Sequence, residues 1–301
     1  MQRDDTPRLR RHRDYRVPVP EGRASFELAF GGVRVSLLDL PTAWDPFVTE
    51  QYAPYARRLS GEPVDLAIRC REGSGTFIPV AGKDATIEIL TERTGPERYH
   101  VRSHFQDGWL DLASGTAELV VTAREWDRFS MSVENFLRIA SQLLLVSRGK
   151  FLMHTAAIVD VGRVHLFFGP SGAGKSTASA FSLPRHALSD DMVIIDTAGE
   201  RAVAESVPFY MVFPPDKRLA GRWPIAGAFR LRQSPDDRLE RLGAARAVAT
   251  VSASIPFVHE LGLPHEGLTR LVGRLCEKVP VFDLHFTRSG RFWDIIRAEG
   301  L

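Results

Sequence analysis

The chain has 301 residues, of which 44% are hydrophobic and 25% are charged. This composition excludes disorder throughout, and at about 100–200 residues per domain the length predicts one large domain or two. The 39 basic and 37 acidic side chains leave a net charge of +2, which is too small a field for nucleic acid to be the main partner. No window approaches the roughly 18 apolar residues of a membrane span, and no signal region follows the N-terminus. We therefore expect a cytoplasmic protein without a membrane partner.

Residues 1–22 combine arginines with aspartates and prolines and show no hydrophobic periodicity, which predicts a flexible basic arm. From residue 23 to 125, short β-type runs alternate with turn residues, so we expect a β-rich N-terminal domain of α+β type. The expected strands are 26–30, 33–40, 64–70, 86–90, 99–104 and 117–122. The expected turns include Gly61, Pro63, residues 73–75 and the pair Asp107-Gly108. Cys70 and Cys276, the only cysteines, are predicted to be core residues without a disulfide or metal role.

The hydrophobic period changes at residue 126. Apolar residues between 126 and 148 recur at helical spacing, and Gly149 follows as a stop signal, which predicts a long and largely buried helix. Beyond it, apolar β runs alternate with helical stretches. This alternation predicts an α/β layer structure for a second domain at 126–301.

The segment Gly-Pro-Ser-Gly-Ala-Gly-Lys-Ser at 169–176 fits the phosphate-loop pattern G-x-x-x-x-G-K-[ST] at every fixed position. It follows a strand candidate at 164–168 and precedes a helix candidate at 177–182, which is the context that such a loop requires. Glycines are needed because the backbone N–H groups wrap a phosphate at distances that a Cβ atom would block. In this motif Lys175 reaches the β- and γ-phosphates, and the Ser176 hydroxyl ligates Mg²⁺. The predicted nucleotide-binding residues are Gly169, Pro170, Ser171, Gly172, Ala173, Gly174, Lys175, Ser176 and Thr177.

The segment Asp-Thr-Ala-Gly at 196–199 is similar to the D-x-x-G switch of GTPases. Too few residues separate Lys175 from Asp196 to hold a helix, a strand and a first switch segment. The chain also lacks an N-K-x-D motif for guanine. We therefore interpret Asp196 as a residue of an exposed hairpin turn that follows a strand at 192–195.

Asp190 and Asp191 form an acidic pair directly before that strand. Adjacent carboxylates repel each other unless a cation or a hydrogen-bond donor gives the two groups different roles. Near a phosphate loop, this favours a division into one metal partner and one proton acceptor over a plain loop or helix cap.

Four features between residues 151 and 196 recur together in a known family. They are His154 in the run Met-His-Thr-Ala-Ala-Ile-Val, a β-hairpin around 160–163, the phosphate loop, and Ser189-Asp190-Asp191. In these features the segment resembles the catalytic domain of HPr kinase/phosphorylase, and it is similar to the nucleotide half of phosphoenolpyruvate carboxykinase. The resemblance implies an α/β P-loop kinase fold of that type, with ATP and Mg²⁺ at Lys175 and Ser176. It further implies that Asp191 is the general base, that Asp190 supports the metal and that His154 lines the site.

The function that follows is an ATP-dependent kinase that phosphorylates a Ser or Thr hydroxyl of a protein or peptide. The N-terminal domain would recognise this acceptor or form a homo-oligomer. The alternative is a regulatory ATPase or GTPase whose only acceptor is water. The family's E-x-R-G-x-G segment is missing between residues 199 and 301, so HPr itself is not implied as the acceptor. Further candidates for a metal ligand or a charge-neutralising arginine are Glu205, Arg222, Arg230 and Arg232, although surface positions are expected for them.

Overall fold

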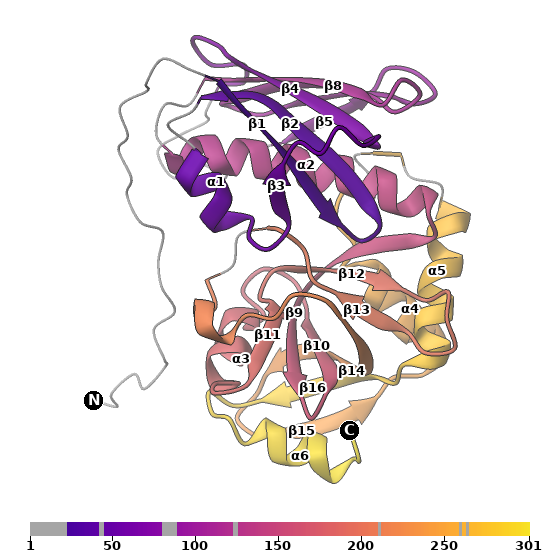
Figure 1. The fold of residues 1–301 in the computed structure, drawn as a ribbon. Coiled ribbons are helices and arrows are strands. Elements are labelled where there is room, and N and C mark those ends of the chain that lie inside the picture. The colour runs from indigo at the N-terminus through magenta and orange to yellow at the C-terminus, as the bar shows by residue number, and fades with distance from the viewer. Residues whose placement is uncertain are drawn as a thin grey trace.

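The computed structural model describes residues 23–41, 45–79, 89–122, 126–209, 212–258, 261–262 and 265–301. The predicted arm at 1–22 lies outside these residues. The described residues form a mixed α/β protein with two mixed sheets (Figure 1). Within the described ranges, no helix is both long enough and apolar enough to span a membrane.

The first sheet has eight strands in the order β3-β1-β2-β4-β8-β7-β6-β5. Its pairs β2–β4 and β4–β8 are parallel. The strands are β1 (Arg23–Phe30), β2 (Val33–Pro41), β3 (Ala56–Arg58), β4 (Leu66–Glu72), β5 (Leu90–Arg93), β6 (Arg98–Arg102), β7 (Gln106–Asp111) and β8 (Thr116–Val121), and the short helix α1 (Asp45–Gln51) precedes β3.

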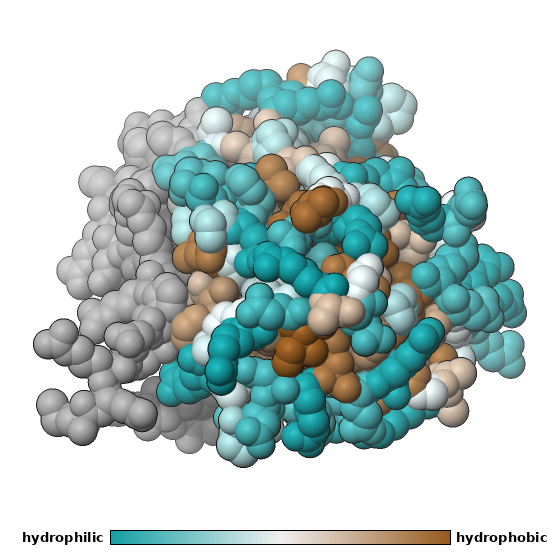
Figure 2. Space-filling model, turned by 90° about the horizontal axis from the view of Figure 1, so that it is seen from below, coloured by the Kyte–Doolittle hydropathy of each residue, from teal (hydrophilic) through white to brown (hydrophobic). Residues whose placement is uncertain are grey.

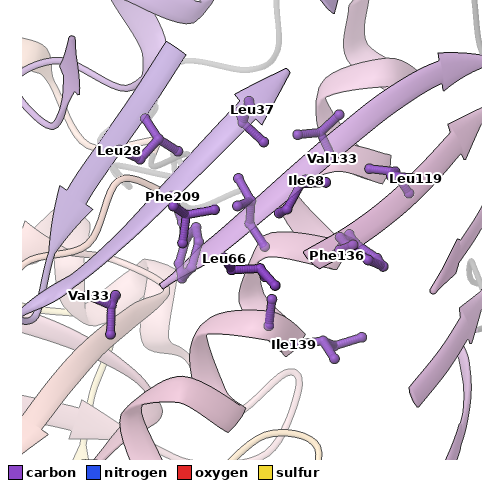
Figure 3. Close-up of a cluster of buried hydrophobic side chains, with 14 of the residues drawn as sticks. Leu28, Val33, Leu37, Leu66, Ile68, Leu119, Val133, Phe136, Ile139 and Phe209 are labelled. Atoms are coloured by element: carbon purple, nitrogen blue, oxygen red, sulfur yellow. The ribbon is translucent and has the colours of Figure 1, made fainter. Parts of the chain in front are cut away.

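Alternate side chains of the first sheet pack on helix α2 (Trp126–Ser147), which lies between the two sheets in Figure 1. This burial follows from the period of two in each strand and the predicted helical period of 126–148. Figure 3 shows the contact, in which strand residues such as Leu37 and Ile68 meet Val133, Phe136 and Ile139 of the helix.

The first sheet and its helix differ from the sequence prediction in several details. Asp107-Gly108 is not a turn but lies inside β7, where Gly108 faces α2. A Cβ atom on Gly108 would lie 2.2 Å from Cε2 of Phe136, so glycine is needed here for a close approach. The strand expected at 86–90 falls partly outside the described residues, and the observed β5 begins at Leu90. Helix α1 carried no clear sequence signal.

The second sheet has the order β10-β9-β12-β13-β14-β16-β15, with β11 paired to β9. Because β14 also pairs with β10, strands β10, β9, β12, β13 and β14 close on themselves. The strands are β9 (Lys150–Asp160), β10 (Arg163–Phe168), β11 (His186–Ser189), β12 (Met192–Asp196), β13 (Val203–Glu205), β14 (Arg222–Gln233), β15 (Arg238–Arg241) and β16 (Val281–Phe286). The predicted hairpin at 160–163 is confirmed, since β9 and β10 pair antiparallel there.

Helices cover both faces of the second sheet. α4 (Ala244–Ser252) and α5 (His265–Lys278) pack on one face, and α3 (Lys175–Phe181) and α6 (Phe292–Ala298) pack on the other. A 3₁₀ turn lies at Pro215–Lys217. On the α6 side, His165 lies between Phe229 and Trp293, and burial lowers its pKa to about 4, so the ring is neutral at pH 7. Seen from the α6 end, hydrophilic side chains cover most of the surface around small hydrophobic groups (Figure 2).

The cysteines differ in burial. Cys70 is buried in the first sheet, as predicted, and its burial raises the pKa of the thiol to about 12. Cys276 on α5 is only partly buried, which corrects the expectation of a core residue, and partial burial raises its pKa to about 11.

The two sheets share a hydrophobic cluster and a polar junction. The cluster includes first-sheet residues together with Leu152, Met192 and Ile194 of the second sheet. At the junction, the Gly31 N–H donates to Oε1 of Glu205 at 2.8 Å, and Nζ of Lys150 donates to the Gly31 carbonyl at 2.9 Å. The β1–β2 turn is therefore docked on the second sheet. That the two parts are separate domains stays a prediction.

Alanine substitutions in the docked β1–β2 turn should distinguish the cost of a steric clash from the cost of backbone strain. Gly31 has φ +61° and a Cβ there would lie 2.5 Å from Cδ1 of Ile194, whereas Gly32 has φ +80° and its nearest neighbour is 3.8 Å away. We expect Gly31→Ala to lower the free energy of unfolding by about 2–4 kcal/mol, and Gly32→Ala by about 1 kcal/mol, which reflects strain alone. Urea denaturation measures both. Equal losses would show that the turn is not docked on Ile194.

Candidate functional site

The glycine-rich loop, residues 169–174, connects the end of β10 to the start of α3. Gly169, Gly172 and Gly174 have φ angles of +152°, +78° and +109°, which side chains rarely adopt. A Cβ on Gly169 would lie 2.9 Å from Cβ of Ala173, and one on Gly174 would lie 2.6 Å from Cζ of Phe286. The loop conformation therefore needs glycine for both backbone and packing reasons.

Lys175 begins α3 and folds back over the loop. Its Nζ donates to the carbonyl oxygens of Gly169 at 2.9 Å and Pro170 at 3.3 Å. Burial lowers the pKa of Lys175, and the negative charge of Asp191 opposes this shift. Ser171 and Ser176 are exposed. The ammonium group is thus held in the loop, and the Ser176 hydroxyl is accessible beside it.

A cavity of about 530 Å³ opens beside the loop on the side of β14 and β16. It is lined by Gly174, Thr177, Gln233, Ser234, Pro235, Phe286 and Arg288. Gln233 also donates from Nε2 to the Gly172 carbonyl at 2.9 Å, which ties the end of β14 to the loop. Apart from Gly174 and Thr177, sequence reasoning missed these residues, because no local motif marks the ends of β14 and β16.

His154 and Asp191 meet beside the loop because β9 pairs with β12, which aligns His154 with Met192. The distance from Nδ1 of His154 to Oδ1 of Asp191 is 3.4 Å. The Ser189 hydroxyl accepts the N–H groups of Asp191 at 3.1 Å and Met192 at 3.0 Å, which orders the turn. Burial lowers the pKa of His154, the charges of Lys175 and Arg138 lower it further, and Asp191 opposes them. The His154 side chain is 38% exposed, so it is not a fully buried core histidine and stays a candidate site residue.

Asp190 points away from its neighbour. Its Oδ2 accepts the Val212 N–H at 3.0 Å, whereas its Oδ1 is buried without a hydrogen-bond partner among the described residues. Burial raises the pKa of Asp190 to about 6, the Val212 N–H opposes this, and the charge of Asp191 adds to it. A buried carboxylate oxygen without a donor is costly, so it is available to a cation. The two aspartates thus have different environments, and their predicted division into a metal partner and a proton acceptor stays a prediction.

Arg138 of α2 contacts the candidate site, and sequence reasoning missed it. Its Nη2 lies 2.8 Å from Oδ2 of Asp191 and 2.6 Å from Oε1 of Glu134. Although burial acts in the opposite direction, the charges of Glu134 and Asp191 raise the pKa of Arg138. The i,i+4 spacing of Glu134 and Arg138 is readable in the sequence, but nothing there connects the pair to Asp191.

Asp196 differs from its predicted exposed position. The predicted hairpin is confirmed, since β12 and β13 pair antiparallel and Oδ1 of Asp196 accepts the Ala198 N–H at 3.0 Å. However, the Asp196 side chain is only 10% exposed, and its Oδ2 accepts from Arg222 at 2.7 Å. Glu205 is likewise largely buried, 3.4 Å from Nε of Arg222. These residues belong to the junction between the sheets, at the opposite end of β12 from Asp191.

Arg230 is largely buried, whereas Arg232 is exposed, as the sequence predicts. Both face Asp283 of β16, to which Arg230 donates two hydrogen bonds, and Arg246 of α4 donates to it at 2.9 Å. Although burial opposes the shift, the hydrogen bond and charge of Arg230 and the charges of the other arginines lower the pKa of Asp283. Asp283 also lies near Glu240 and His285 in a geometry that could hold a metal ion. Because three arginines engage its carboxylate, this cluster is better explained as an ion-pair network.

Comparison with known proteins adds a weak structural similarity. No family model matches the sequence, and no curated protein matches it. Among solved structures, the chain is similar to the HPr(Ser) kinase/phosphatase from Coxiella burnetii, with a TM-score of 0.29 and 9% sequence identity. The match covers 50% of this chain and 95% of that one. A likeness of this size supports no shared activity.

Proposed function

We propose that this protein is an ATP- and Mg²⁺-dependent phosphotransferase that phosphorylates a Ser or Thr hydroxyl of a protein or peptide. The observation that carries the proposal is the contact of Asp191 with His154, next to Lys175 at the glycine-rich loop. Residues from β9, the β11–β12 turn and α3 are distant in the sequence but share one site. A carboxylate that can accept a proton, close to a loop lysine that can neutralise phosphate charge, is an arrangement that phosphoryl transfer uses.

In this proposal each part of the substrate ATP is assigned a place. The backbone N–H groups of the loop would bind its phosphates, and Lys175 would leave the loop carbonyls for the β- and γ-phosphates. The neighbouring cavity, with Phe286 and Arg288 in its wall, suits the nucleoside. The γ-phosphate would then point toward Asp191, on the other side of the loop.

Two oxygen donors beside the loop would hold a magnesium ion. Among the residues that the structure describes, Oδ1 of Asp190 is buried without a hydrogen-bond partner, and Ser176 is exposed at the start of α3. Both are hard oxygen ligands of the kind that Mg²⁺ prefers. When bound there, the ion would neutralise charge on the phosphates.

The chain's own residues would carry out the proton transfer. Asp191 would accept the proton of the acceptor hydroxyl while the new bond from that oxygen to the γ-phosphorus forms. The bond from the γ-phosphorus to the β,γ-bridging oxygen breaks, and ADP leaves with the electron pair. His154 would contact the transferred group, and Lys175 would stabilise its negative charge.

Label transfer from ATP tests the proposal. The purified protein is incubated with Mg²⁺, γ-labelled ATP and a library of Ser- and Thr-containing peptides, with Lys175→Ala as the inactive control. Retention of label on a peptide or on the protein itself supports the kinase. Release of free phosphate alone would overturn it in favour of the regulatory ATPase, and unchanged turnover in Lys175→Ala would show that the loop is not the phosphate site.

A further inference from the structure

A chain of polar contacts connects Asp191 to the first sheet. Nη2 of Arg138 contacts both Asp191 and Glu134, at 2.8 and 2.6 Å. The other oxygen of Glu134 accepts from Nε2 of Gln51 at 3.0 Å, and Gln51 ends helix α1, which belongs to the first-sheet layer. The contacts therefore run from α1 through α2 to the acidic pair.

The surroundings hold this arginine in one orientation. Arg138 and Glu134 are one turn apart on α2, and both side chains are largely buried, with exposed fractions of 19% and 6%. The guanidinium lies 5.4 Å from the ring centre of Phe209, which packs in the same core as the first sheet. A planar guanidinium with fixed partners on two sides restrains the carboxylate that it contacts.

We infer that Arg138 is a positioning residue for Asp191, and that Glu134 and Gln51 hold it in place. The inference rests on the proposed function, in which Asp191 accepts the proton. If so, the first-sheet layer helps to position the catalytic carboxylate, in addition to any role that it has in binding the acceptor. A change that moves α1 or α2 would then change the rate of phosphoryl transfer without touching the nucleotide.

Kinetics of the full-length protein tests this inference. If Arg138 acts through Asp191, Arg138→Gln should lower kcat by about 100-fold, with a change below about threefold in the KM for ATP. In an Asp191→Asn background, the same substitution should change kcat by less than about threefold, because coupled residues are not additive. Arg138→Lys keeps the positive charge but loses the planar guanidinium group. Its kcat should therefore be about tenfold higher than that of Arg138→Gln. Equal losses in both backgrounds would overturn the inference.

Arg148 offers a matched control. It follows α2 and joins it to the first sheet through Asp65 at 2.5 Å and the Gly32 carbonyl at 2.6 Å, without a contact to Asp191. Arg148→Gln should change kcat by less than about twofold, whereas Glu134→Gln and Gln51→Ala should lower it by about 3–10-fold. A loss in Arg148→Gln as large as in Glu134→Gln would assign these effects to general loosening of α2 and would count against the inference.

An NMR titration of His154 provides a readout that needs no activity. His154 faces Asp191, Lys175 and Arg138, and Asp191 raises its pKa. The measured quantity is the drop in the pKa of His154 on Asp191→Asn, in metal- and nucleotide-free protein. That drop should at least halve in Arg138→Gln, because Asp191 is no longer held against the ring. An undiminished drop would overturn the inference even if label transfer is observed, and a diminished drop would support it even if label transfer fails.

Discussion

Asp191→Asn should lower phosphoryl transfer by about 10²–10⁴-fold, because the amide has the same size but cannot accept the proton of the acceptor hydroxyl. Nucleotide binding should persist, since the loop and the cavity beside it do not depend on this carboxylate. The amide oxygen can still accept from Arg138, which keeps its second partner, Glu134. Turnover at saturating ATP and Mg²⁺, with nucleotide binding by calorimetry, measures the two effects separately.

Asp196→Asn is the matched control for that substitution on the same strand. Asp196 is ion-paired with Arg222 at the junction between the sheets, so its loss should lower the free energy of unfolding by about 1–2 kcal/mol. Turnover per folded molecule should stay unchanged. An inactive Asp196→Asn beside an active Asp191→Asn would overturn the kinase assignment and restore the GTPase-like interpretation.

Asp190→Asn should make the metal-free protein more stable, and it should raise the Mg²⁺ concentration that the enzyme needs for turnover. The pKa of Asp190 is about 6 in the folded protein, against an ordinary value of 3.8. Because the raised pKa favours the protonated form, the folded state loses stability as the pH rises from about 4 through 6. Above pH 6 the buried charge lowers the free energy of unfolding by its full amount, about 3 kcal/mol. The buried amide of Asn leaves a polar atom unpaired as well, so we expect a net gain of about 1–2 kcal/mol at pH 8 that disappears near pH 4.

Urea denaturation at pH 8 and pH 4 without metal measures this gain. Asp216→Asn is the control, because that carboxylate is 74% exposed and its replacement should change stability by less than about 0.5 kcal/mol. In the same Asp190→Asn protein, the Mg²⁺ concentration for half-maximal turnover should rise about 10–100-fold. A variant that is less stable than the natural chain at pH 8 would contradict the description of Asp190 as a desolvated carboxylate.

Much of the local structure was predictable because each feature depends on neighbouring residues. The glycine-rich loop lies between a strand and a helix, the hairpins at 160–163 and after Asp196 form where expected, and α2 ends one residue before the predicted end at 148. The turn signal failed at Asp107-Gly108, where the glycine instead allows Phe136 to pack closely on β7. Here a packing contact with a helix distant in the sequence, and not a turn, explains the glycine.

The sequence by itself marked Lys175 through the phosphate-loop motif and the acidic pair Asp190-Asp191 through its place after that loop, and the family resemblance added His154 as a candidate. Only the tertiary structure decided how these groups differ and which others join them. The pairing of β9 with β12 brings His154 close to Asp191. The closure of the second sheet buries Asp196 in the junction between the sheets. The packing of α2 places Arg138 in contact with Asp191. Burial and ion pairing are properties of the assembled layers. For this reason, two adjacent aspartates that look equivalent in the sequence have different partners and different chemistry in the fold.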